Sequence, residues 1–578
     1  MLPRRNGSIG FKPRKRRLVR TWLVTGGNGK LTRSRFARFT LARLQICNRH
    51  ILSVQHLSVL SSDYPFNLLN RQQADDFINL QTKFRRFELQ MSIRNDNLLE
   101  RGYWEDIKPE AELSGYARAK NYWTELSRPS FLSRRGTGGP RKPARRTAYL
   151  DGLRGFAAFL VYWHHHQLWA RDVILADVIF ERGFGYDGKY YFVTLPGIRT
   201  FFSGGHYAVT VFFVISGYVL STKPMSLIHN GEFLKLFENV ASALFRRWLR
   251  LFLPVICTTF LYMTSWHLFG IWIAAANIEP NYGAELWKWY CEWKSFSFVF
   301  KTGGDPWLTY DLHVWSIPVE FRGSIIIYTS LLAFSRATRN ARLWCEIGLT
   351  FYFMYIADGS HYSMFCAGML LCDLDLLAEK GDLPSFFYRL EPFKELIFYH
   401  LLVISVYLGG VPSHNLDVGE IKQVRGWYYL SFLKPQAVFD YKWFYLFWAA
   451  TLLVASIPRI PWLKRFFEMP FNQYLGRISF ALYLVHGPIL WVLGDRLYAA
   501  VGWAREAHHE HLPAWVNIFP LSKAGPLGFE LSFWAPHLII LPVTLWISQV
   551  VTKLFDEPSV KFAQWLYGRT LAPPPIKA

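Results

Sequence analysis

The sequence is poor in cysteine and in charged residues. It holds only 6 Cys in 578 residues, and no two of them form a CxxC pair. This scarcity excludes a disulfide framework and the common cysteine zinc motifs. Charged residues make up 19% of the chain, below the roughly one quarter typical of soluble domains. Aromatic residues reach 18%. The composition therefore indicates either a very aromatic soluble enzyme or a protein with several membrane spans.

The N-terminal segment lacks acidic residues. Residues 1–62 contain no Asp or Glu but 14 Lys and Arg, so more than half of the formal net charge of +23 lies there. Such a segment has three interpretations: a nucleic-acid-binding arm, an acid-poor transit peptide, or a disordered basic arm near anionic lipid. The composition favours the last, so no nucleic-acid partner is expected. We predict that residues 1–148 form a polar, basic and largely disordered extension.

Long apolar segments recur after residue 150, and no apolar segment of secretory type precedes residue 100. Ten segments approach the roughly 17–25 residues that a bilayer requires. They are 153–171, 205–222, 251–274, 314–334, 343–357, 360–378, 396–412, 440–457, 476–496 and 532–554. The predicted fold is an all-α polytopic membrane protein with about ten transmembrane helices. Its membrane domain covers 149–565, and 566–578 form a short tail.

The basic loops indicate an orientation. If the N-terminus is cytoplasmic, the loops after even-numbered spans should be rich in Lys and Arg. The loops after the second and fourth spans and before the ninth are basic, whereas the loop after the sixth begins with acids. We therefore expect an integral multi-pass protein of an endomembrane or the plasma membrane, with both termini in the cytoplasm.

Ionisable residues inside the apolar segments are costly, so they mark candidate functional groups. Arg154 and His165 are 11 residues apart in the first segment. In a helix this spacing turns about 1,100° and rises ~16 Å, so both side chains share one face. His165 is one of three consecutive histidines, with His164 and His166, and the spacing to Arg154 favours it as the functional one.

Two further groups of polar residues stand at the ends of spans. Arg247 and Arg250 are at i, i+3 before the third span and, with Arg154, suit a polyphosphate through charge-assisted hydrogen bonds. The alternative is a simple cytoplasmic anchor. Ser316 and Glu320 are at i, i+4 in the fourth span and should face together.

The fourth span has two further features. Pro318 should disturb the helix, and Glu320 could alternatively form a buried pair with Arg322.

A cluster of histidines lies outside the predicted spans. The histidines at 508, 509 and 511 lie in a loop and are interpreted as solvated. No metal site is therefore predicted.

Six motifs follow one another along the chain. They are Tyr149-Leu150-Asp151-Gly152-Leu153-Arg154-Gly155 with His165, Phe212 to Leu220, Arg247-x-x-Arg250, Trp315-Ser316-x-x-x-Glu320, Leu475 to His486, and Glu557-Pro558. In this order they resemble the membrane acyltransferase family 3, which includes O-acetyltransferases of carbohydrates and small molecules. The match spans about 149 to 565 and is most similar to fungal members. One departure is that Glu320 is followed by Phe321, where the family often has two adjacent acids.

The resemblance implies transfer of an acyl group, usually acetyl, from cytoplasmic acyl-CoA to a hydroxyl of a carbohydrate, lipid or small molecule. Acyl-CoA is then a donor substrate, and no permanently bound cofactor is expected. The implied catalytic residues are His165, as general base, with Glu320 and Ser316. The implied substrate-binding residues are Arg154, Arg247, Arg250, His313 and Trp315.

Three points remain open here. His313 and His486 are lesser catalytic candidates, and an acyl-histidine relay is an alternative to single-step transfer. A proton-coupled secondary transporter would also place His, Glu and Arg inside the membrane. Transporter halves usually repeat, however, and the sequence shows no second copy of the Arg–x10–His or Trp-Ser-x-x-x-Glu patterns.

Overall fold

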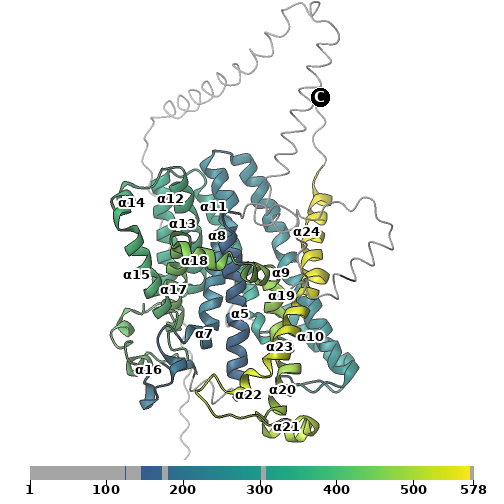
Figure 1. The fold of residues 1–578 in the computed structure, drawn as a ribbon. Coiled ribbons are helices and arrows are strands. Elements are labelled where there is room, and N and C mark those ends of the chain that lie inside the picture. The colour runs from purple at the N-terminus through teal and green to yellow at the C-terminus, as the bar shows by residue number, and fades with distance from the viewer. Residues whose placement is uncertain (1–123, 125–144, 172–179, 301–306, 415, 573–578) are drawn as a thin grey trace, which may run out of the picture. The chain divides into compact units, whose positions relative to one another are not determined.

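The computed structural model describes Thr124 and residues 145–171, 180–300, 307–414 and 416–572. The chain divides into two compact units, Met1–Arg94 and Asn95–Ala578, and all described residues belong to the second. Every regular element among them is a helix (Figure 1). The predicted extension lies outside the described residues, apart from Thr124 and residues 145–148.

Five helical segments of the described chain are long and apolar enough to cross a membrane, and a bent pair makes a sixth. The bent pair is Tyr441–Arg459 with Pro461–Phe467 (α18), which meet at 102°. The chain is therefore an integral membrane protein, and its described part is all-helical. The five are α8 (Gly205–His229), α9 (Phe233–Phe269), η5 with α11 (Leu312–Phe334), the segment Pro470–Ala500, which begins with α19 (Pro470–Ile489), and the segment Leu531–Thr570.

The other predicted spans also fall on helices. Each is either short or carries polar residues; α5, for example, has three consecutive histidines. The last helix, α24 (Glu557–Thr570), runs past the predicted domain boundary at residue 565. The helices that carry these predicted spans are α5 (Ala148–Ala170), α12 (Arg339–Phe351), which continues as the π-helix η6 (Tyr352–Ile356), α13 (Ser360–Glu379), α15 (Lys394–Leu408) and α17 (Tyr441–Ser456), which is part of the bent pair.

Helix α5 lies between α8 and α19 in the bundle (Figure 1). A Cβ atom on Gly155 would lie 2.2 Å from the backbone nitrogen of Gly476, and one on Gly476 would lie 2.3 Å from the carbonyl oxygen of Asp151. Glycine is required on both sides of this crossing, as is common where membrane helices approach closely. This close crossing fixes α5, which carries His165, against α19, which carries His486.

Helices α8 and α13 cross in the same way. A Cβ on Gly217 would lie 2.0 Å from the carbonyl oxygen of Phe365, and one on Gly368 would lie 2.1 Å from that of Val214. Side chains from these helices and from α5, α9, α11, α17 and α19 share one hydrophobic core.

The helix that carries Ser316 and Glu320 is not disturbed by its proline. Leu312–Trp315 form a short 3-10 helix, η5, and α11 (Ser316–Phe334) begins directly after it. Pro318 is thus the third residue of α11, in the first turn, where backbone N–H groups have no intrahelical partner. The expectation that Pro318 disturbs the helix is therefore wrong, because the helix starts only two residues earlier.

Candidate active site

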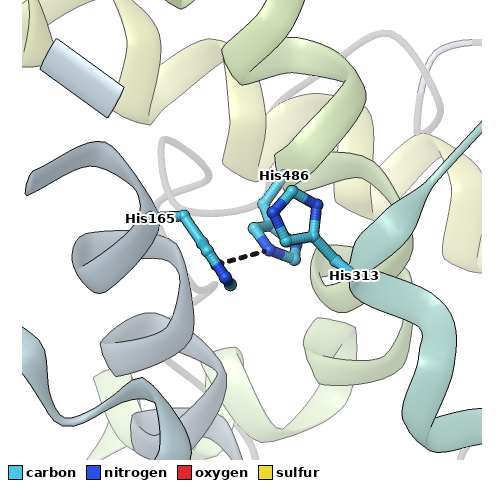
Figure 2. A group of neighbouring side chains, drawn as sticks. All are labelled: His165, His313 and His486. Atoms are coloured by element: carbon cyan, nitrogen blue, oxygen red, sulfur yellow. Dashed lines mark hydrogen bonds between the residues drawn. The ribbon is translucent and has the colours of Figure 1, made fainter. Parts of the chain in front are cut away.

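Three histidines from separate parts of the chain meet in the bundle (Figure 2). His165 comes from α5, His313 from η5 and His486 from α19. The ring centres of His165 and His313 are 4.0 Å apart, and those of His313 and His486 are 4.7 Å apart. We call these three residues the histidine cluster. It brings the predicted His165 and His313 together with the lesser candidate His486.

The hydrogen bonds of His486 fix its tautomer. Its Nδ1 lies 2.7 Å from the carbonyl oxygen of Tyr483, which only accepts, so Nδ1 carries the proton. In the neutral ring Nε2 is then an acceptor, and it lies 3.2 Å from His165 Nδ1. His165 Nδ1–H donates this bond, which leaves His165 Nε2 with a free lone pair.

His313 is held by a carboxylate and by a close backbone. Its Nδ1 lies 3.2 Å from Asp311 Oδ1, and Asp311 is buried. The same edge of the ring reaches α19, where a Cβ on Gly487 would lie 2.2 Å from His313 Nδ1 and 3.2 Å from Asp311 Oδ1. The imidazole thus fits against α19 only because residue 487 has no side chain.

Ser316 and Tyr483 connect η5 to α19. Their hydroxyl oxygens are 2.7 Å apart, and the Tyr483 hydroxyl donates to the backbone carbonyl of His313. Tyr483 is one turn before His486 on the same face of α19. The network therefore sets His313 against His486.

The other two consecutive histidines point elsewhere, because successive residues of a helix are about 100° apart. His166 Nδ1 lies 2.8 Å from the Tyr498 hydroxyl. His164 faces Glu181 and His206, and these three side chains form the second potential metal-ligating group among the described residues. Among the three consecutive histidines, His165 is the one in the histidine cluster.

Trp315 lies in an aromatic group beside η5. Its ring centre is 5.8 Å from those of His361 and Trp443, and the centres of His361 and Trp443 are 4.6 Å apart. Trp443 also contacts the ring of His206, at 5.9 Å. The group offers apolar faces and imidazole nitrogens next to the histidine cluster.

Glu320 does not share its contacts with Ser316. Arg247 donates to the Glu320 carboxylate, and its Nε donates to the Ser324 hydroxyl at 2.8 Å. Arg322 Nε donates instead to the carbonyl oxygen of Val299, at 2.9 Å. Glu320 thus belongs with the arginines of α9, and the alternative Glu320–Arg322 pair is replaced by Glu320–Arg247.

The three predicted arginines face two carboxylates. Arg154 and Arg250 both interact electrostatically with Asp556, in η12 (Thr552–Asp556). Arg154 Nη2 donates to the carbonyl oxygen of Gly476 at 3.0 Å, and its buried Nε has no hydrogen-bond partner among the described residues. A surface pocket opens beside them. Its lining residues are Ala243, Arg246, Arg247, Arg250, Tyr328, Val560 and Ala563.

Sequence reasoning missed three residues of this site, namely Asp311, Tyr483 and Asp556. Tyr483 stands at i, i+3 from His486, a spacing that could have revealed it. Asp556 directly precedes the Glu557-Pro558 motif. Asp311 could have been found as the acid two residues before His313.

Comparison with known proteins identifies the family. The acyltransferase domain family matches residues 147–553. The chain is 30% identical over 500 residues to the O-acetyltransferase PaAT-1 of Phomopsis amygdali, covering 78% of this chain and 90% of that protein. It is 22% identical over 490 residues to the acyltransferase clz18 of Cochliobolus lunatus (71% and 95%), and 24% identical over 495 residues to the acyltransferase R4 of a Phoma species (74% and 97%). No solved structure matches the chain significantly.

The family match covers most of the chain and all six motifs except Glu557-Pro558. None of the three relatives is named as a transporter, so the transporter alternative has no support among them. The resemblance read from the sequence is confirmed. With its membrane-spanning helices and this match, the chain belongs to the acyltransferase domain family and is a membrane acyltransferase.

Proposed function

We propose that this acyltransferase transfers an acetyl group from acetyl-CoA to a hydroxyl of a small-molecule, carbohydrate or lipid acceptor. The 30% identity to a protein named as an O-acetyltransferase supports both the acetyl group and the oxygen acceptor. The observation that carries the proposal is the hydrogen bond between His486 and His165, which leaves a lone pair on His165 Nε2.

His165 is the general base of this reaction. Its half-buried ring receives the proton of the acceptor hydroxyl on Nε2 as the hydroxyl oxygen attacks the thioester carbon. The new C–O bond forms, the C–S bond breaks, and the CoA thiolate leaves with the proton returned by His165. The transfer occurs in a single step, because no activated Cys or Ser stands in the histidine cluster.

His313 and Trp315 bind the acceptor. With Nδ1–H donated to Asp311, His313 Nε2 accepts a hydrogen bond from a second polar group of the acceptor. The Trp315 ring supplies an apolar face beside it. Ser316 supports catalysis indirectly, because its bond to Tyr483 holds η5 and α19 together.

The arginines bind the phosphates of the donor. Arg246, Arg247 and Arg250 line one pocket, and Arg154 stands with Arg250 against Asp556, so several guanidinium groups gather where a polyphosphate can bind. Glu320 holds Arg247 in place, which differs from the catalytic role that the resemblance implies for it. Arg154 and His165 are ~16 Å apart along α5, so an extended donor can reach from one to the other.

The proposed enzyme has ten spans. Six are the five strongly apolar segments and the bent pair, and the other four are α5, α12 with η6, α13 and α15. Both termini are cytoplasmic, and the arginines then face cytoplasmic acetyl-CoA. Residues 149–565 form the catalytic membrane domain, between the basic extension 1–148 and the tail 566–578.

The test is product analysis in a heterologous host that lacks the protein. Extracts are compared by mass spectrometry for metabolites heavier by one acetyl group, and membranes are assayed with labelled acetyl-CoA. The wild type should form an acetylated product, and His165→Ala should lower its rate by about 100-fold or more. Binding of labelled acetyl-CoA to the solubilised His165→Ala protein should persist.

The matched control is His509→Ala, which removes an exposed histidine and should keep the wild-type rate. A double Arg154→Ala, Arg250→Ala variant should lose acetyl-CoA binding instead. A folded His165→Ala protein with wild-type turnover would refute the base assignment, and failure of the wild type to bind acetyl-CoA would refute the donor.

A further inference from the structure

A second group of ligating side chains lies beside the histidine cluster. His164 comes from α5, His206 from α8, and Glu181 from the segment before the 3-10 helix η3 (Tyr186–Gly188). One ligand atom from each lies within 4.8 Å of the others. His164 and Glu181 side chains are only 4% and 3% exposed, and that of His206 is 33% exposed.

The two imidazoles point at one carboxylate but do not hydrogen-bond to it. His164 Nδ1 lies 3.7 Å from Glu181 Oε1, and His206 Nδ1 lies 3.8 Å from Glu181 Oε2. Hydrogen bonds between these atoms would be about 2.7–3.2 Å long. Both Nδ1 atoms are buried and have no hydrogen-bond partner among the described residues. Two orphaned buried nitrogens at one place call for a ligand between them.

The separations fit a bound cation. Zinc bonds to imidazole nitrogen and carboxylate oxygen are about 2.0–2.2 Å long, so two ligands of a tetrahedral ion lie ~3.4 Å apart. The observed 3.7 and 3.8 Å are within a few tenths of this value. Two imidazoles and one carboxylate form the donor set of a zinc site whose fourth position takes water.

The surroundings hold Glu181 in the orientation that ligation needs. The Ser413 hydroxyl donates to Glu181 Oε2, and the Ser413 backbone N–H donates to the Glu181 carbonyl at 2.8 Å. Arg199 donates to the carbonyl oxygens of Phe180 and Arg182, both at 3.0 Å. The positive charge of Arg199 lowers the affinity of this site for a cation. Its guanidinium group is directed to the backbone, however, by these hydrogen bonds to carbonyl oxygens. Such outer contacts orient metal ligands in known sites.

Close backbone packing also brings the imidazoles together. A Cβ on Gly205, the first residue of α8, would lie 2.6 Å from Cδ2 of His164. The lack of a side chain lets the His164 ring lie against α8, directly beside His206.

We propose that His164, Glu181 and His206 bind one divalent transition-metal ion, with Zn²⁺ as the preferred one. The ion ties the segment before η3 to α5 and α8. Because His164 directly precedes His165, the ion also restrains the turn of α5 that carries the proposed base. The inference does not depend on the identity of donor or acceptor.

The test measures metal binding to the full-length protein in detergent. Chelator-treated protein is titrated with Zn²⁺ alone, and metal content is read by mass spectrometry after desalting. The wild type should hold about one Zn²⁺ per chain with a Kd below ~1 µM, and chelation should lower its Tm. Co²⁺ in place of Zn²⁺ should give the visible absorption of a four-coordinate site.

Two ligand variants and two controls make the assignment specific. Glu181→Gln and His206→Ala should each weaken Zn²⁺ binding by at least about 10-fold. His400→Ala, at an exposed residue of α15, and His486→Ala, in the histidine cluster, should keep the metal. The proposal is overturned if the wild type binds no Zn²⁺ in this range, if folded Glu181→Gln and His206→Ala bind it as tightly as the wild type, or if His486→Ala loses it.

Discussion

His486 acts on the proposed base through one hydrogen bond. Its Nδ1–H is held by the Tyr483 carbonyl, so its Nε2 accepts from His165 and fixes which nitrogen of His165 is free. A partner of this kind orients an imidazole without touching the substrate. His486 is therefore a positioning residue, and its loss should affect the chemical step.

We predict that His486→Ala lowers kcat for acetyl transfer by about 10-fold or more and leaves KM for acetyl-CoA unchanged. The reason is that His165 then loses its fixed tautomer, whereas the arginines keep the donor. His486→Gln, whose amide oxygen can accept, should restore part of kcat. A rise in KM with unchanged kcat would contradict the positioning role.

Asp311 gives the site a pH dependence. This residue lies just before the span Leu312–Phe334, and burial raises its pKa to about 7, opposed by His486 and by the backbone N–H of His313. The fold thus favours the protonated carboxyl, so the stability from this group is present at low pH and is lost as the pH rises through about 7. Activity should change in the opposite direction, because the carboxylate holds His313 Nδ1–H.

We therefore expect kcat to rise with pH, with an inflection near the Asp311 pKa of about 7. Asp311→Asn should lower activity and remove this inflection, since the amide does not titrate. The measurement is a rate profile from pH 5 to 9 at saturating acetyl-CoA. An unchanged inflection in the variant would assign the titration to another group.

At the scale of elements, the bundle depends on glycines where helices cross. Gly217 on α8 faces the Phe365 carbonyl so closely that a Cβ would lie 2.0 Å from it. Gly348 on α12 is also inside a helix, but a Cβ there meets nothing within 4 Å. The two residues form a matched pair, because the helix propensity gain of alanine is the same and only the packing differs.

We predict that Gly217→Ala lowers Tm in detergent and the yield of folded protein, because α8 and α13 must separate to admit the methyl group. Gly348→Ala should be neutral or stabilising by up to about 1 kcal/mol. Thermal unfolding followed by size-exclusion chromatography measures both. Equal Tm values for the two variants would show that this crossing is not tightly packed.

At the scale of the whole molecule, span number decides where the termini lie. The described chain has five strongly apolar spans, or six with the bent pair. An odd number puts the termini on opposite sides of the membrane, whereas the proposed ten puts both in the cytoplasm. Epitope tags at each end of the full chain, probed with protease in sealed microsomes, should both be digested. Protection of one tag would refute the ten-span arrangement.

The sequence by itself determined the class, the family and the helical faces of this protein. Apolar length, loop charge and motif spacing are local properties, so the helices and the shared face of Arg154 and His165 follow from residues close in the chain. The three consecutive histidines could be ranked by the same spacing. Local geometry also indicated that Ser316 and Glu320 lie on one face of a helix.

Only the tertiary structure decided which of these groups meet. His165 and His486 are 321 residues apart, and Arg247 and Glu320 are 73 apart. Helical spacing says nothing about partners on other helices, which are set by crossings at glycines such as Gly155 and by packing of the whole bundle. For this reason Glu320 joins the arginines, and His164 joins Glu181 and His206.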